Sequence, residues 1–217
     1  METVTTLVLA GCFVAAVAYS FYAGRKRTAE LAELAARLGF NFDPAGIPFP
    51  NFPMFKLLEQ GSSRAIRNCL SRSDGGKRIC IFDFSYVTGS RKHRRSHSQS
   101  VVTFSIGHTS LPPFLLRPEN LLDKVGDFLG FQDLDFESHP RFSKIYRLQS
   151  SSDERVRALF QPGVLQYFEN NPGLYLEARG PELLFCRADR LLQPEDVAGL
   201  LQEAQQTLAL LTSGNLS

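Results

Sequence analysis

The chain has 217 residues, and the roughly 190 that follow an apolar N-terminal segment are enough for one domain with a sizeable core. The formal net charge of +2 does not by itself indicate a partner. The four cysteines are scattered and form no CxxC pair, which excludes a small disulfide-stabilised scaffold and suits a reducing compartment.

The N-terminal segment has no charged side chain between Glu2 and Arg25, and the basic triplet Arg25, Lys26 and Arg27 closes it. A helix rises about 1.5 Å per residue, so this segment can cross a hydrocarbon core of about 30 Å. Lys and Arg beside a span stay on the cytoplasmic side, so the triplet sets the topology. We therefore predict a transmembrane anchor over residues 1–27, with the N-terminus outside.

Two other targeting signals compete with the anchor. A cleaved signal peptide needs a positively charged start, which this segment lacks. The run from Leu9 to Cys12 resembles a bacterial lipobox, but the apolar stretch before Cys12 is short and the stretch after it stays apolar. The charge pattern favours the anchor, and lipidation of Cys12 is left open.

Residues 28–53 are predicted to form a juxtamembrane helix and a Pro-rich linker. Thr28 to Leu38 carries its leucines on one stripe, and Gly39 is placed as a C-cap. This helix either continues the anchor as a stalk or packs as the first helix of the domain. Asp43 to Pro53 contains four prolines and is expected to be irregular.

Residues 54–217 are predicted to form one cytoplasmic α+β domain with a mainly antiparallel sheet. A short helix over 54–59 opens it. Asp74-Gly75 is a tight-hairpin signal, and Leu111-Pro112-Pro113 is expected to break the sheet. The expected strands cover residues 65–71, 77–87, 100–106, 114–117, 144–149, 174–179 and 182–188.

Three helices are predicted in the C-terminal half. Ser151 and Glu154 are spaced as a capping box for the first, and Pro162 is expected to begin the second. The last begins at Pro194 and carries its apolar residues on one stripe, which is typical of an amphipathic helix packed on a sheet.

A second basic run lies between two expected strands and forms the predicted hairpin loop. Basic groups near a cytoplasmic leaflet are attracted to anionic lipid by about 1 kcal/mol each, so we predict binding of anionic lipid or an acidic partner. A solvated tip that blocks edge pairing is the alternative. Nucleic acid ranks last, because no aromatic residue interleaves the charges. The predicted binding residues are Arg91, Lys92, His93, Arg94, Arg95 and His97.

No metal site or cofactor is predicted. His93 and His97 have an i, i+4 spacing, but four cations surround them and no carboxylate lies in the loop. Asp133, Asp135 and Glu137 lack the glycine and distal glutamate of an EF-hand loop, so we interpret them as a polar loop. The sequence contains no GxSxG, HExxH, P-loop or GxGxxG pattern, and no catalytic residue is predicted.

Asp83 is the only carboxylate in the most apolar expected strand. It alternates away from the Phe82 side of the strand, so we expect it to be partly solvated and to pair with the basic loop. A membrane-associated enzyme with a pocket near Asp83 and the Pro-rich segment is the alternative function. Convergence of Asp83 with His108 and His139 would favour that alternative.

Several runs resemble a family of uncharacterised bacterial single-pass membrane-anchored proteins. The resemblance covers most of the chain and implies a bacterial inner-membrane location, with no implied activity. We therefore expect a single-pass membrane protein with a cytoplasmic binding domain, and leave its oligomeric state open. The runs are Phe82–Ser90, Leu111–Phe114, Arg117–Glu119, His139–Ser143 and Tyr146.

Overall fold

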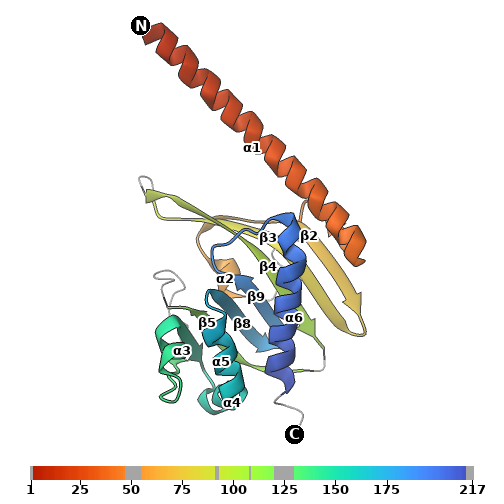
Figure 1. Ribbon diagram of the computed structural model, residues 1–217, viewed down its shortest axis with the longest axis vertical. Coiled ribbons are helices and arrows are strands. Elements are labelled where there is room, and N and C mark those ends of the chain that lie inside the picture. The colour runs from red at the N-terminus through yellow and green to blue at the C-terminus, as the bar shows by residue number, and fades with distance from the viewer. Residues whose placement is uncertain (1, 47–54, 91–92, 108, 120–129, 214–217) are drawn as a thin grey trace.

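In the part of the chain that the structure describes, a nine-stranded antiparallel sheet forms the centre of the domain (Figure 1). The computed structural model describes residues 2–46, 55–90, 93–107, 109–119 and 130–213. The strand order is β1-β2-β3-β4-β9-β8-β5-β7-β6, and all these neighbours pair antiparallel. The predicted α+β class with a mainly antiparallel sheet is confirmed. The strands are β1 (Asn41–Asp43), β2 (Ser62–Asp74), β3 (Lys77–Thr88), β4 (Arg95–Ile106), β5 (Leu111–Pro118), β6 (Gln132–Asp133), β7 (Tyr146–Ser150), β8 (Leu174–Gly180) and β9 (Glu182–Arg187).

The two faces of the sheet are covered differently. One face packs against α4, α5, α6 and one end of α1, and α2 packs on the other face (Figure 1). The predicted amphipathic C-terminal helix is confirmed, because the apolar stripe of α6 is buried against this sheet. The helices are α1 (Glu2–Leu38), α2 (Lys56–Glu59), α3 (Pro140–Ile145), α4 (Asp153–Leu159), α5 (Pro162–Asn170), the short 3-10 turn η3 (Pro194–Asp196) and α6 (Val197–Ser213).

Helix α1 is continuous and has two contrasting halves (Figure 1). In the C-terminal half, Leu31 and Leu34 are buried in the core, and burial of a leucine contributes about 1.5–3 kcal/mol. The N-terminal half projects from the domain, with Phe13 and Phe21 71% and 72% exposed. The segment predicted over 28–38 therefore packs as the first helix of the domain and also continues the segment before it.

The transmembrane anchor predicted over residues 1–27 is not confirmed. Where the structure describes side chains, no helix combines the length and the apolar character that a membrane span requires.

The hairpin predicted around Asp74-Gly75 is confirmed. Asp74 pairs with Lys77, so Gly75 and Gly76 make a two-residue turn with φ angles of 55° and 78°. A turn with two positive φ angles matches the twist of the flanking strands and favours glycine. The strands predicted over residues 174–179 and 182–188 are confirmed too: β8 and β9 pair antiparallel, with Arg179 opposite Glu182.

The break predicted at Leu111-Pro112-Pro113 is wrong, because β5 begins at Leu111. Its pairing with β8 shifts register between Leu111 and Phe114. A bulge leaves residues outside the regular ladder, so the missing N–H groups of Pro112 and Pro113 do not interrupt the strand.

The predicted capping box at Ser151 and Glu154 is also wrong. The N-cap of α4 is Ser152, and its side chain makes no capping hydrogen bond. The Ser152 N–H instead donates to the Ser150 hydroxyl at 2.8 Å, so the end of β7 makes the local contact. The second helix begins at Pro162 as predicted.

Two strand boundaries differ from the sequence prediction. Strand β4 begins at Arg95, five residues before Ser100, because it pairs with β3 along its whole length. Strand β7 begins at Tyr146, because residues 140–145 form α3. Asp43, which was expected in the irregular linker, lies in β1 and pairs with Cys69 of β2. Residues 47–54 of that linker lie outside the described ranges.

Candidate functional site at the junction of α1 with the sheet

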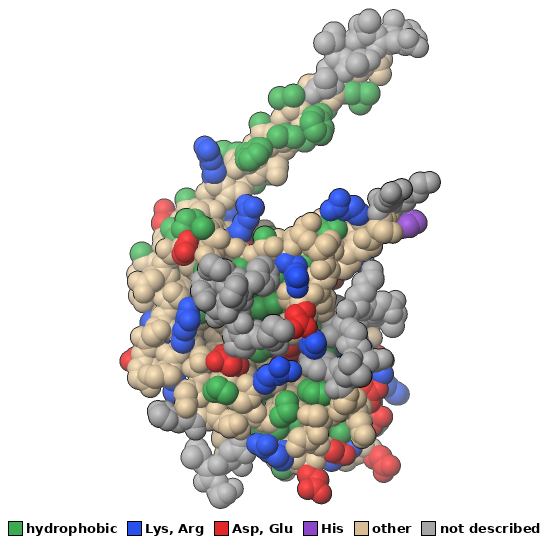
Figure 2. Space-filling view, turned by 180° about the vertical axis from the view of Figure 1, so that it is seen from behind, with side chains coloured by type: hydrophobic (Ala, Val, Ile, Leu, Met, Phe, Trp, Pro, Cys, Tyr) green, Lys and Arg blue, Asp and Glu red, His purple; other side chains and the backbone are tan. Residues whose placement is uncertain are grey.

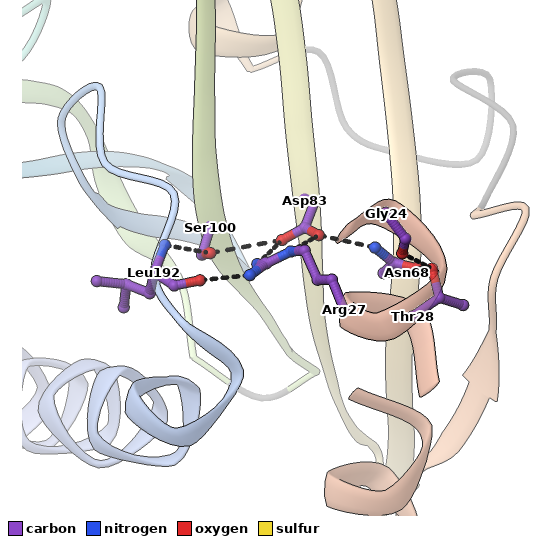
Figure 3. A network of polar contacts seen from close by, with 7 residues as sticks. All are labelled: Gly24, Arg27, Thr28, Asn68, Asp83, Ser100 and Leu192. Atoms are coloured by element: carbon purple, nitrogen blue, oxygen red, sulfur yellow. Dashed lines mark hydrogen bonds and ion pairs between the residues drawn. The ribbon is translucent and has the colours of Figure 1, made fainter. Parts of the chain in front are cut away.

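Arg27 joins α1 to the sheet through a two-pronged ion pair with Asp83 (Figure 3). Its Nε and Nη2 atoms donate to the two carboxylate oxygens at 2.8 and 2.7 Å. Its Nη1 atom donates to the Leu192 carbonyl oxygen at 2.6 Å. Each of the two charged side chains is 16% exposed. Such a planar fork fixes orientation as well as distance, so α1 is held at a defined angle to β3.

Neighbouring polar groups complete this junction (Figure 3). Asn68 Nδ2 donates to the Asp83 carboxylate at 2.9 Å, and the Thr28 hydroxyl lies 2.9 Å from Asn68 Oδ1. Asn68 has a φ of 52° and lies in a register shift of β2, a conformation that Asn tolerates better than most residues. The Ser100 hydroxyl donates weakly to Asp83 at 3.5 Å and accepts the Leu192 N–H at 3.1 Å. The network therefore links α1, three strands and the segment before η3.

The partner predicted for Asp83 is wrong. Its ion pair is with Arg27, and the second basic run does not supply its partner. The residues predicted to set the topology also differ in their contacts. Arg27 is engaged in the junction, whereas Lys26 forms an exposed ion pair with Glu30 at 3.6 Å. The predicted boundary between residues 27 and 28 falls inside this junction.

A sequence signal for Arg27 existed but was missed. Residues 27, 31 and 34 are spaced by four and three positions, which places them on one helix face. Leu31 and Leu34 are the buried members of that face. A cation that extends a buried apolar stripe by one turn is therefore a candidate for an internal ion pair, although its partner 56 residues away cannot be read from the spacing.

The end of the β3–β4 hairpin carries the second basic run. Arg91 and Lys92 lie outside the described residues, and His93, Arg94 and Arg95 are exposed. Gly89 allows this turn, because its φ is 80° and a Cβ there would lie 2.0 Å from the His93 carbonyl oxygen. Both this hairpin end and the projecting half of α1 extend from the same side of the domain (Figures 1 and 2).

His97 does not belong to an exposed loop, contrary to the sequence interpretation. It lies in β4, with its side chain 12% exposed and its ring stacked on Tyr86 at 4.6 Å. Its Nδ1 atom is 2.8 Å from the Asp189 carboxylate and its Nε2 atom is 2.9 Å from the Thr88 hydroxyl. Burial raises the pKa of the Tyr86 phenol well above its ordinary value. These contacts make His97 part of the base that supports the hairpin.

Sequence reasoning missed a buried carboxylate on the other face of the sheet. Glu177 on β8 accepts hydrogen bonds from the backbone N–H groups of Lys56 and Leu57, both at 2.6 Å, and from the Tyr175 hydroxyl. Burial raises the pKa of Glu177 to about 7, although these three donors act in the opposite direction. The carboxylate therefore holds the start of α2 against the sheet.

The remaining predicted candidates do not converge. His139 precedes α3 beside β7, and four strands separate β7 from the β3 strand of Asp83. His108 lies outside the described residues. The structure therefore does not bring Asp83 and His139 together, and the enzyme alternative remains a prediction without an assembled site.

One residue of the acidic cluster that was predicted to be a polar loop, Asp133, has a structural role. Asp133 lies in β6 and accepts hydrogen bonds from Arg147 and Gln149, and the Arg147 guanidinium lowers the pKa of that carboxyl group. Across the described ranges, no group of three or more His, Cys, Asp or Glu side chains is arranged to hold a metal ion.

Comparison with known proteins gives a likeness of fold to a solved structure. No protein-family model matches the sequence, and no curated protein matches it. The crystal structure of the mycobacterial trehalose monomycolate transport factor A, TtfA, has a TM-score of 0.60 to this chain at 12% sequence identity. The likeness covers 86% of this chain and 95% of that one. At this identity it shows a shared fold, and the resemblance to bacterial membrane-anchored proteins stays a prediction.

Proposed function

We propose that this protein is a single-pass membrane protein of the bacterial inner membrane, with its α+β domain in the cytoplasm acting as an accessory binding module. The observation that carries this proposal is the construction of α1. Its exposed apolar half leaves the domain, and its other half is fixed to the sheet by Arg27 and Asp83. A contiguous exposed apolar surface marks an interaction site, and the uncharged run from residue 3 to residue 24 suits the interior of a bilayer.

The rigid junction gives the domain a fixed orientation beneath the membrane. Because α1 continues into the core, the domain follows the helix instead of hanging from a flexible linker. The basic end of the β3–β4 hairpin extends to the side from which α1 emerges, which supports contact with the lipid surface (Figure 2). Four basic residues there would contribute up to about 4 kcal/mol with anionic lipid. An acidic partner protein is the alternative occupant.

The likeness to TtfA agrees with an accessory role. The name of that protein describes a transport factor for trehalose monomycolate. A membrane-fixed module that contacts lipid or an acidic membrane partner would serve a comparable supporting role without catalysis of its own. The lipid or partner that this chain serves is not specified by a shared fold.

Reporter fusions test the proposed topology. A green fluorescent protein fused after Ser217 should fluoresce, and a periplasmic alkaline phosphatase fused at the same place should be inactive, because the domain lies in the cytoplasm. The converse pair of results would contradict the orientation and favour lipidation of Cys12 and export of the domain.

A further inference from the structure

A groove of about 550 Å³ lies between α1 and β2, where the helix leaves the domain. One wall consists of α1 residues from Ser20 to Thr28, and the other includes Pro44 and Arg67. If α1 crosses the bilayer up to its basic triplet, this groove opens at the level of the lipid headgroups. It lies beside the Arg27–Asp83 junction and is separate from the basic end of the β3–β4 hairpin.

The groove carries an uncompensated positive charge. Arg25, Arg27 and Arg67 line it, and none of the lining residues that the structure describes is a carboxylate. Asp83 neutralises Arg27 through the two-pronged pair. The side chains of Arg25 and Arg67, in contrast, make no hydrogen bond or ion pair with any residue that the structure describes. Two guanidinium groups therefore remain to receive an anion.

The opposite end of the groove is apolar. Phe21 lines it and is 72% exposed, and it precedes Arg25 by four residues, so the two side chains share a helix face. Phe21 lies on the membrane side of Arg25 along α1. A ligand that matches both ends of the groove has an anionic head beside Arg25 and Arg67 and an apolar tail beside Phe21.

We propose that this groove binds the phosphate group of an anionic phospholipid, with Arg25 and Arg67 on the phosphate oxygens and Phe21 against an acyl chain. The guanidinium fork matches phosphate geometry, and basic residues at the cytoplasmic end of a span attract anionic headgroups. This inference rests on the proposed membrane anchor and assigns Arg25 a ligand in addition to its role in topology. A free phosphate ion shares the headgroup chemistry but has no apolar part that could contact Phe21.

Native mass spectrometry of the full chain in a neutral detergent tests the groove. The chain is titrated with phosphatidylglycerol, with phosphatidylcholine and with inorganic phosphate in separate arms. We expect one phosphatidylglycerol to bind before any other lipid, with phosphatidylcholine weaker and inorganic phosphate giving no comparable 1:1 adduct. Arg67→Gln should weaken binding of this first lipid about tenfold, because one charge-assisted contact is lost.

Matched variants make the test specific. Lys77→Gln removes the same charge from an exposed residue at the other end of the β2–β3 hairpin and should leave lipid binding unchanged. Arg67→Lys keeps the charge without the fork and should fall between the wild type and Arg67→Gln. An unchanged melting temperature of Arg67→Gln shows that lost binding is not lost folding. Equal weakening by Lys77→Gln would overturn the groove as the site.

A parallel measurement separates this inference from the anchor itself. The same chains are reconstituted into vesicles and extracted with alkaline carbonate. Resistance to extraction, together with equal binding of phosphatidylglycerol and phosphatidylcholine, would overturn the groove proposal and leave the anchor standing. Release by carbonate would overturn the anchor and the groove proposal with it. Binding of inorganic phosphate as tight as that of phosphatidylglycerol would overturn a lipid as the ligand.

Discussion

The two basic runs of this chain look alike in sequence and differ in structure. The first, Arg25 to Arg27, places one guanidinium in a largely buried fork with Asp83. The second, at the end of the β3–β4 hairpin, leaves Arg94 and Arg95 exposed. The first run therefore holds α1 to the domain, and the second presents charge to the surroundings. The number of charges in a run does not distinguish a structural cation from a binding cation. The position of the cation relative to a buried apolar helix face does.

The largest expected effect is at the junction. Arg27→Ala and Asp83→Ala should each lower the free energy of unfolding by about 2–4 kcal/mol, because each leaves a largely buried charge without its partner. The double variant should lose much less than the sum of the two, since neither charge remains. Chemical denaturation of the full chain in detergent measures this cycle.

Lys26→Ala is the matched control for the cycle. Lys26 belongs to the same basic run, but its pair with Glu30 is exposed, and such pairs contribute about 0–1 kcal/mol. If Lys26→Ala destabilises the protein as much as Arg27→Ala, the distinction within this run is wrong.

A second prediction concerns Glu177, a buried carboxylate whose hydrogen-bond partners are all uncharged. Its pKa is raised from an ordinary 4.5 to about 7, so between these values the folded chain keeps a proton that the unfolded chain releases. Stability should therefore fall as pH rises from about 4.5 to about 7, by up to about 3 kcal/mol. The melting temperature measured across this range tests the sign.

Glu177→Gln is the informative variant for this pH dependence. It cannot ionise, so its melting temperature should vary less between pH 5 and pH 8 than that of the wild type. It also places an amide where two backbone N–H groups donate, so a lower stability at pH 5 is expected. An equal pH dependence in both proteins would assign the titration to another group.

The smallest stability effect is expected at the hairpin end. Replacing Arg91, Lys92, Arg94 and Arg95 by Ser should change the free energy of unfolding by no more than about 0.5 kcal/mol, as is usual for surface substitutions. A fragment that begins at Gly24 keeps Arg27 and can be tested by flotation with anionic vesicles. Its binding should weaken as salt rises and be strongly reduced in the four-Ser variant, because the fragment keeps Arg25 and Arg67 but lacks the Phe21 wall of the groove. Unchanged binding of that variant would assign lipid contact to another surface.

Much of the fold could be predicted because its signals are local. The turn at Gly75-Gly76, the start of α5 at Pro162 and the apolar stripe of α6 each depend on neighbours in the sequence. The errors occurred where tertiary pairing outweighed those signals. The bulge after Leu111 absorbs two prolines, and pairing with β3 extends β4 back to Arg95.

The junction could be predicted only in part. A helical stripe containing positions 27, 31 and 34 can be read from the sequence, but the identity of Asp83 as partner depends on the placement of α1 over β3. Glu177 was missed because a single carboxylate in an apolar strand resembles an exposed residue, and its two backbone donors, the N–H groups of Lys56 and Leu57, lie more than 100 residues away. Long-range polar contacts of this kind carry no periodic signal.

The most direct test of the account is the depth of the hairpin end relative to the membrane. In full chains with Cys12→Ala reconstituted into anionic vesicles, a thiol-reactive fluorophore is placed at His93→Cys or at Asp74→Cys, near opposite ends of β3. Headgroup spin-labelled lipid should quench the probe at residue 93 much more strongly than the probe at residue 74, because α1 and its Arg27 junction hold the first end toward the bilayer. Equal quenching, or stronger quenching at residue 74, would contradict the account.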